Sequence, residues 1–156
     1  MITQHLNFPE YDFKIKGING RPFIFDKIRK RFVALTPEEW VRQNMIEFLT
    51  IEKKYPSGRF GNEVKLNING MPKRCDSVFY DEKANPLLII EYKAPHIKIT
   101  QSVFDQIATY NLPLQAKYIL VSNGLEHFFC EIDYKLHKYI FFNEIPAFNT
   151  LMSSVV

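Results

Sequence analysis

Three charged residues near the middle of the chain have the types and the spacing of a catalytic metal site. Asp76 precedes a mostly apolar stretch, Glu91 follows another, and Lys93 lies two residues further on. A hairpin centred between Lys83 and Ala84 would place Asp76 opposite Glu91 on antiparallel strands, with Cβ atoms about 4.5–5.5 Å apart. Glu91 and Lys93 would share one face of their strand, because side chains alternate between faces. A shift of one residue in this register would separate the two acids.

Two carboxylates that face each other need a compensating charge. Like charges directly opposite destabilise a sheet, and the apolar run 87–90 before Glu91 is typical of a buried strand. A divalent cation would compensate them, because hard cations take carboxylate oxygens. The ammonium of Lys93 could then orient an attacking water or stabilise a pentavalent phosphate. The pattern predicts metal-dependent phosphodiester hydrolysis, and the alternative is a set of ordinary solvated charges at strand ends.

The surrounding sequence predicts the elements that would hold these residues. Asn19-Gly20 and Asn69-Gly70 each lie between alternating segments, which is a strong hairpin signal. Thr36 is a good N-cap and Glu39 completes a capping box, so a helix is expected to begin there and to end near 55–58. A second helix is expected from Thr100 to about residue 111. The predicted strands cover 11–16, 22–25, 31–35, 62–68, 73–80, 86–93, 117–122, 125–132 and 138–142.

The order of these elements predicts an α/β protein with a mixed sheet and an α-β-β-β-α-β core. The 156 residues suggest a single domain. It would consist of an N-terminal β extension at 1–35, a core at 36–145 and an unpatterned, mobile tail at 146–156. No linker or internal repeat divides the chain.

Composition excludes several classes of protein and favours none strongly. The net charge of +3 permits nucleic-acid binding without arguing for it. The cysteines, Cys75 and Cys130, lack metal-ligand spacing, so we expect a reducing cytoplasm. No signal peptide and no apolar run of the ~18–20 residues that cross a bilayer are present. The absence of a GxxxxGK[ST] loop gives no support for ATP use.

Several short motifs together resemble the PD-(D/E)XK nuclease superfamily. More narrowly, residues 30–145 are similar to the N-terminal nuclease domain of type I restriction enzyme R subunits. The motifs that carry the resemblance are Arg74-Cys75-Asp76, Ile89-Ile90-Glu91-Tyr92-Lys93-Ala94-Pro95, Gln106-x-x-x-Tyr110, Val121-Ser122-Asn123-Gly124 and the helix start at 36–43. The D-x₁₄-E-x-K spacing is weak alone, and its combination with the two helices and the Asn-Gly turn is more specific. Cys75 stands where the superfamily name has proline.

The resemblance implies a restriction-endonuclease-like fold and a DNA endonuclease that uses Mg²⁺ or Mn²⁺. It implies that Asp76, Glu91 and the backbone carbonyl of Tyr92 hold the metal. Glu39 is the best match to a first-helix glutamate that completes such a site, although a capping box also explains an acid there, and Glu63 is a weaker candidate. Supporting or nucleic-acid-binding roles would belong to Gln106, Tyr110, Arg74 and Lys98.

Other interpretations remain open at this point. The chain could be a catalytically inactive nuclease-fold module that binds nucleic acid or a protein partner, such as a subunit of a restriction or defence system. Tyr110 could be an ordinary core residue. The basic run 27–31 could be a solvated face or a phosphate contact. An edge strand of the N-terminal extension could pair with a second copy to form a homodimer.

Overall fold

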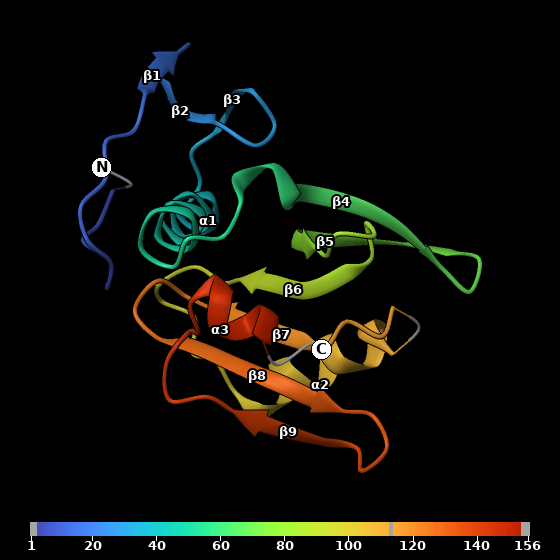
Figure 1. The fold of residues 1–156 in the computed structure, drawn as a ribbon. Helices are drawn as coiled ribbons and strands as arrows, with labels where there is room; N and C mark the ends of the chain where they lie inside the picture. The colour runs from blue at the N-terminus through green and yellow to red at the C-terminus, as the bar shows by residue number, and fades with distance from the viewer. Residues whose placement is uncertain (1–2, 113, 154–156) are drawn as a thin grey trace.

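A six-stranded mixed sheet forms the centre of the computed structural model, which describes residues 3–112 and 114–153 except for the side chain of Tyr110 (Figure 1). The strand order is β4-β5-β6-β7-β8-β9, and every neighbouring pair is antiparallel except β6 and β7, which are parallel. The strands are β4 (Phe60–Ile68), β5 (Met71–Tyr80), β6 (Pro86–Tyr92), β7 (Tyr118–Ser122), β8 (His127–Asp133) and β9 (Lys138–Phe141). Helix α2 (Gln101–Asn111) connects the parallel pair, as a parallel connection requires. The predicted mixed α/β class and the α-β-β-β-α-β order are both confirmed.

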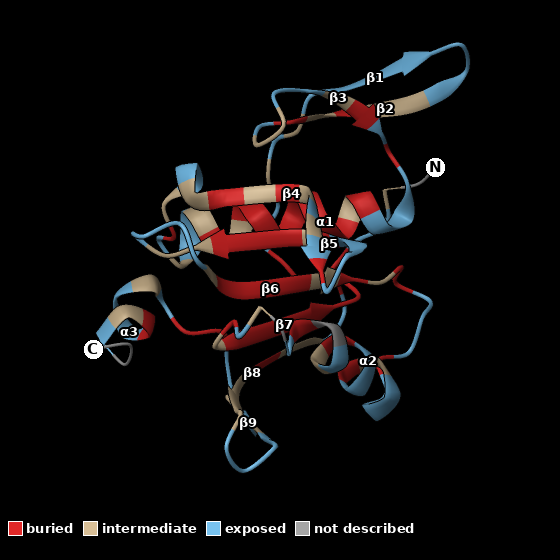
Figure 2. Cartoon of the chain, turned by 90° about the vertical axis from the view of Figure 1, so that its right-hand side faces the viewer, coloured by how far each residue is buried: buried red, intermediate tan, exposed pale blue. Residues whose placement is uncertain are grey.

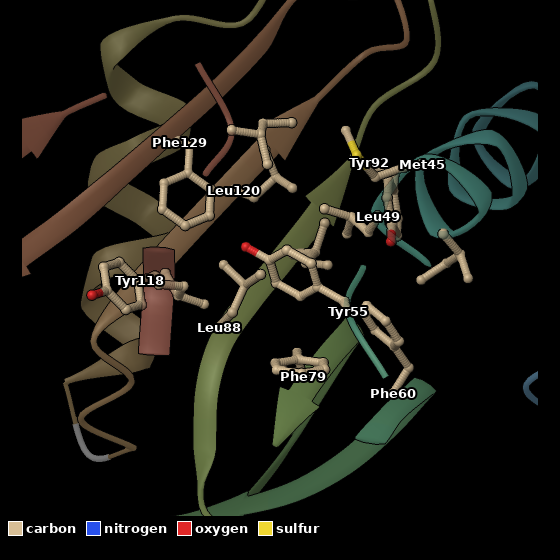
Figure 3. Close-up of a cluster of buried hydrophobic side chains, with 14 of the residues drawn as sticks. Met45, Leu49, Tyr55, Phe60, Phe79, Leu88, Tyr92, Tyr118, Leu120 and Phe129 are labelled. Atoms are coloured by element: carbon tan, nitrogen blue, oxygen red, sulfur yellow. The ribbon is translucent and has the colours of Figure 1, made fainter. Parts of the chain in front are cut away.

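Helix α1 (Pro37–Glu47) covers one face of this sheet and continues into a π-helical turn, Phe48–Glu52. It begins as predicted, because the Thr36 hydroxyl accepts a hydrogen bond from the Glu39 amide at 3.0 Å. Val41, Met45 and Leu49 lie at helical spacing on its buried side. They join a core of aliphatic and aromatic side chains from β5 to β8, part of which Figure 3 shows.

Helix α2 covers the opposite face, so the molecule has helices on both sides of its sheet. Phe104 and Ile107 of α2 pack with Ile89 of β6, Ile119 of β7 and Cys130 of β8. The central strands β6 and β7 are therefore buried on both faces, which explains why their sequences are mostly apolar and do not alternate. In the described part of the chain, no helix has the length and apolarity needed to span a membrane.

A second, three-stranded antiparallel sheet lies beyond α1, at the top of Figure 1. It consists of β1 (Ile15–Ile18), β2 (Arg21–Asp26) and β3 (Arg31–Ala34). Asn19 and Gly20 both have positive φ, as a two-residue hairpin turn requires. The predicted strand from residue 11 was wrong at its start, because β1 begins at Ile15. Tyr11 and Phe13 contact side chains of the helical segment 37–52 and do not pair with a strand. The Phe13 ring lies 5.1 Å from that of Trp40, and the Tyr11 hydroxyl donates to Glu52.

The predicted tail at 146–156 is also corrected. Residues Phe148–Ser153 form helix α3, whose Leu151 is 1% exposed in the core that it shares with α1, and residues 154–156 of the predicted tail lie outside the described residues. The Phe148 amide donates to the carbonyl of Lys53 at 2.8 Å. A six-residue helix offers too few turns for its periodicity to be evident in the sequence.

The Asn123-Gly124 turn is closely packed, and this gives a testable contrast between two glycines. Gly124 has φ +86°, and an added Cβ would lie 2.8 Å from Leu6 Cδ2 and 3.1 Å from Val41 Cγ2; Gly70 has φ +78° with open space around it. We expect Gly70→Ala to lower the free energy of unfolding by about 1–2 kcal/mol through backbone strain alone. Gly124→Ala should cost about 2–3 kcal/mol, because crowding adds to that strain. Equal losses in urea unfolding would show that Leu6 moves aside freely.

Candidate metal centre

The predicted pairing of Asp76 with Glu91 rests on the register of β5 and β6. Ser77 pairs with Ile90 and Val78 with Ile89, so Asp76 and Glu91 are the next positions along the two strands. The predicted register is confirmed for these pairs, and a bulge at Phe79/Tyr80 absorbs the asymmetry of the turn. Asp76 and Glu91 are both half-buried.

The backbone ladder between β5 and β6 ends where Asp76 begins. The Asp76 carboxylate accepts a hydrogen bond from the backbone N–H of Tyr92 at 2.9 Å, so a side chain takes the β6 amide. The Asp76 main-chain carbonyl accepts instead from Arg42 Nη1 at 2.5 Å. Both ends of the residue are thus fixed, and its carboxylate is held beside the end of β6.

Glu63 of β4 extends this row of acids to a third strand. The pairs Asn62–Ser77 and Val64–Cys75 lie on either side of it, so Glu63 lies at the level of Asp76. Its φ of +53° is unusual for a non-glycine residue within a strand. Strain of this kind is retained where the surroundings enforce it, and it is concentrated at functional sites.

Side chains before and after the kink at Glu63 point to different faces of the sheet. Asn62 and Ser77 are buried together, with Ser77 Oγ donating to Asn62 Oδ1 at 2.6 Å and Tyr92 Oη donating to Ser77 Oγ at 2.9 Å. Beyond the kink, Val64 and Cys75 contribute to the core on the α2 face. Glu63 and Asp76 therefore lie where the side chains of β4 and β5 change from one face of the sheet to the other.

Arg42 of α1 connects the acidic residues to one another. Its Nε donates to Glu39 Oε2 at 3.0 Å and its Nη2 donates to Glu63 Oε1 at 2.6 Å, in addition to the bond to Asp76. Its side chain is 7% exposed. A buried guanidinium needs such partners, because an unpaired buried charge is very costly.

Glu39 is equally well satisfied. Its Oε1 accepts from Arg29 Nη2 at 2.8 Å, and its Oε2 accepts from both Arg42 and Gln43 Nε2 at 3.0 Å. The reciprocal half of the predicted capping box is replaced by these contacts, and the Thr36 amide bonds to the Ala34 carbonyl. Glu39 is held as the central acceptor of an arginine network.

Burial sets the electrostatics of the site. Loss of water raises the pKa of Asp76, although the Tyr92 amide and Arg42 act in the opposite direction, and Glu63 adds to the rise. The pKa of the Cys75 thiol is raised to about 12 by burial and by Glu91 and Asp76. Arg42 has a raised pKa because Glu39, Tyr92 and Glu63 outweigh its own burial. A cation beside Asp76 would relieve the cost of its ionised form.

The available oxygen donors are of the type that hard cations take, but they are few. Within residues 3–112 and 114–153, no group of three or more His, Cys, Asp or Glu side chains is gathered closely enough to bind a metal together. A cation here would rely on the Asp76–Glu91 pair, a backbone oxygen such as that of Tyr92, and water. Mg²⁺ is commonly bound by one or two carboxylates and keeps several waters.

Comparison with known proteins shows the family of the chain. Residues 37–146 match the family model described as the type I restriction enzyme R protein N terminus. The chain belongs to this family. Among solved structures, a fragment described as an HsdR subunit of a type I restriction enzyme from Vibrio vulnificus YJ016 has a similar fold, with a TM-score of 0.57 and 18% identity. The match covers 79% of this chain and 26% of that one, so this chain spans about a quarter of its structural relative. None of the curated proteins matches it.

The structure connects the remaining predicted site residues less firmly to the acids of β4, β5 and β6. Lys93 is half-buried just beyond β6, and its backbone N–H donates to the Ser122 carbonyl at 2.9 Å. Arg74 is exposed and forms an ion pair with Glu63 at 3.4 Å. Gln106 and Lys98 are exposed, on α2 and on the connection before it. The side chain of Tyr110 lies outside the described residues.

The arginines that organise the site were not predicted from the sequence. Arg29 was included in a basic run expected to be solvated or to contact phosphate, whereas its side chain is 13% exposed and bonds to Asp26 and Glu39. Arg42 was noticed only as part of a motif. Both follow an acid by three residues, at Asp26 and Glu39, and this spacing within a helix or turn was the available signal.

Asp26 provides a pH test of this network. Burial disfavours its ionisation, but hydrogen bonds from Asn62 and Arg29 outweigh burial and lower its pKa. Its contribution to stability is therefore present above the unfolded-state value of 3.8 and is lost as pH falls through the lower folded-state pKa. We expect Asp26→Asn to destabilise the protein at pH 7 by about 1.5–3 kcal/mol. The difference from wild type should shrink in thermal melts as the pH approaches 2, and a constant difference would contradict the assignment.

Proposed function

We propose that this chain is a Mg²⁺-dependent DNA endonuclease domain with a PD-(D/E)XK, restriction-endonuclease-like core. The observation that carries the proposal is the placement of Asp76 next to Glu91, at the level where the β5–β6 ladder ends and the Asp76 carboxylate takes the Tyr92 amide. Membership in the R-protein family supports the same conclusion. We also propose that the chain works with other subunits of a restriction system.

In this proposal Asp76, Glu91 and the Tyr92 carbonyl hold Mg²⁺, with Mn²⁺ as a substitute. When bound, the ion supplies a lowered pKa for an attacking water and neutralises charge on the scissile phosphate. Lys93 is two residues beyond Glu91, where its ammonium positions the water or the phosphate. Arg74, Lys98, Gln106 and Tyr110 are proposed to contact the DNA.

Glu39 acts through Arg42 in this scheme, and not as a metal ligand. Both of its oxygens already accept hydrogen bonds from Arg29, Arg42 or Gln43. Arg42 in turn fixes the Asp76 carbonyl and the Glu63 carboxylate. The helix acid therefore positions the guanidinium that orients the acidic row.

A cleavage assay tests the proposal. The chain is incubated with supercoiled plasmid and with linear duplex, in Mg²⁺, in Mn²⁺ and in EDTA. We expect cleavage only with a divalent ion, and a loss of about 10²–10³-fold in rate for Lys93→Ala. Lys83→Ala, in the exposed turn between β5 and β6, is the matched control and should cleave normally. Cleavage in EDTA, or full activity of Lys93→Ala, would reject this mechanism. Salt-sensitive DNA binding without any cleavage would favour the inactive module.

A further inference from the structure

The small N-terminal sheet has two chemically different faces. Ile15, Ile24 and Val33 pair across the strands and form the inner face, where Ile24 is fully buried beside Leu35 and Trp40. The opposite side carries a mixture of rings and cations. We name it the outer aromatic face, and it consists of Lys14, Lys16, Arg21, Phe23, Phe25 and Phe32.

Two of the cations on this face lie over the rings. Phe25 pairs with Phe32 across the strands, and the two ring centroids are 5.3 Å apart in an edge-on arrangement. Lys16 Nζ lies 3.9 Å from the centroid of Phe32, and Lys14 Nζ lies 5.7 Å from that of Phe25. Phe23 is opposite Lys16 in the register. All three phenylalanines are half-buried, so each presents part of its ring at the surface.

The charged side chains of the outer aromatic face are all cationic, and Asp12 and Glu47 lie at its edge, where they line a cavity together with Lys14 and Phe25. Asp26 is the sole acid within β1, β2 and β3, all of which the structure describes, and it lies on the inner side, bonded to Arg29 and Asn62. Lys14, Lys16 and Arg21 are exposed. Figure 2 shows β1 as the outermost and most exposed strand of the molecule. The face therefore combines exposed cations with partly exposed rings.

We propose that the outer aromatic face binds single-stranded DNA, with phosphates on Lys14, Lys16 and Arg21 and with bases stacked on the phenylalanines. Proteins that bind single strands combine a basic surface with aromatic side chains in this way. An intact duplex offers phosphates but no free base faces, so it would leave the rings unused. The choice of DNA over another polyanion rests on the proposed function.

The same sheet is attached to the acidic row. Asp26 at the end of β2 bonds to Arg29, and Arg29 bonds to Glu39, the partner of Arg42. A strand held on the outer aromatic face is thereby bound to an element that is fixed to the site. This gives the N-terminal extension the role of a substrate-holding platform.

Fluorescence anisotropy with a labelled oligo-dT of about 15 nucleotides tests the proposal. The whole chain is used in EDTA, so that cleavage cannot interfere. We expect Phe32→Ala to weaken binding about five-fold or more, and Phe32→Trp to retain it. The double change Lys14→Gln/Lys16→Gln should also weaken binding and reduce the salt slope by about 1.4.

Matched controls lie on the β8–β9 hairpin, at the other end of the molecule. Phe141→Ala and Lys135→Gln/Lys138→Gln alter exposed residues of the same types and should bind oligo-dT as wild type does. Equal affinities across the outer-face and control variants would overturn the proposal. So would tighter binding of a duplex that ignores Phe32→Ala, or a self-association that Phe32→Ala abolishes while oligo-dT binding persists. A chain that binds oligo-dT through this face but never cleaves would reject the proposed function alone.

Discussion

Replacing Arg42 by methionine is expected to lower the free energy of unfolding by about 3–5 kcal/mol. The change removes three hydrogen bonds at once and leaves the buried Glu39 carboxylate with less compensation. It also leaves the Asp76 carbonyl without its donor. Breaking a buried ion pair from one side is costly because the remaining charge stays desolvated. In thermal unfolding, the midpoint should fall by about 6–20 °C.

Two comparisons separate this effect from a simple loss of charge. Arg74→Met removes an arginine that is 62% exposed and pairs only loosely with Glu63, so it should cost less than about 1 kcal/mol. Adding Glu39→Gln to Arg42→Met should recover part of the loss, because it removes the stranded charge. If the two arginine variants unfold at the same temperature, the buried network does not stabilise the fold as the contacts imply.

The parts of the site that the sequence predicted depend on short-range rules. The register of Ser77 with Ile90, next to Asp76 and Glu91, follows from the length of one turn and from an apolar run that must be buried, and the bulge at Phe79/Tyr80 did not disturb it. The Asn19-Gly20 hairpin and the Thr36 cap depend on neighbours within a few residues. Features of this kind can be predicted without knowing how distant parts of the chain pack.

What could not be predicted depends on residues far apart in the chain. No propensity favours φ of +53° at a glutamate, and Glu63 adopts it where Arg42 and the adjoining strand hold it. Arg29 is mostly enclosed because Glu39, ten residues later, faces it and binds its guanidinium. Leu151 is buried only because α3 docks against residues 53–55, after α1, and against β5, which a six-residue pattern does not reveal.

Asp76→Asn is expected to abolish cleavage by about 10³-fold or more while the protein remains folded. Asparagine keeps an oxygen that can accept the Tyr92 amide, as the carboxylate does at 2.9 Å. It lacks the negative charge that a hard cation requires. Loss of a metal's charge stabilisation is worth several kcal/mol in the transition state, which corresponds to a rate effect of this size. Asp81→Asn, in a turn where Oδ1 accepts the amides of Lys83 and Asn85, is the matched control and should cleave normally.

The stability of Asp76→Asn gives this prediction a second readout. Burial raises the folded-state pKa of Asp76 above its unfolded value of 3.8. Its favourable contribution is therefore present below that value and is lost as pH rises through the folded-state pKa, so the ionised group opposes folding at pH 7. The neutral variant should then melt at the same temperature as metal-free wild type or higher. Mg²⁺ should raise the melting temperature of wild type and leave that of Asp76→Asn unchanged. An active variant, or one that Mg²⁺ stabilises equally, would show that the ion binds elsewhere.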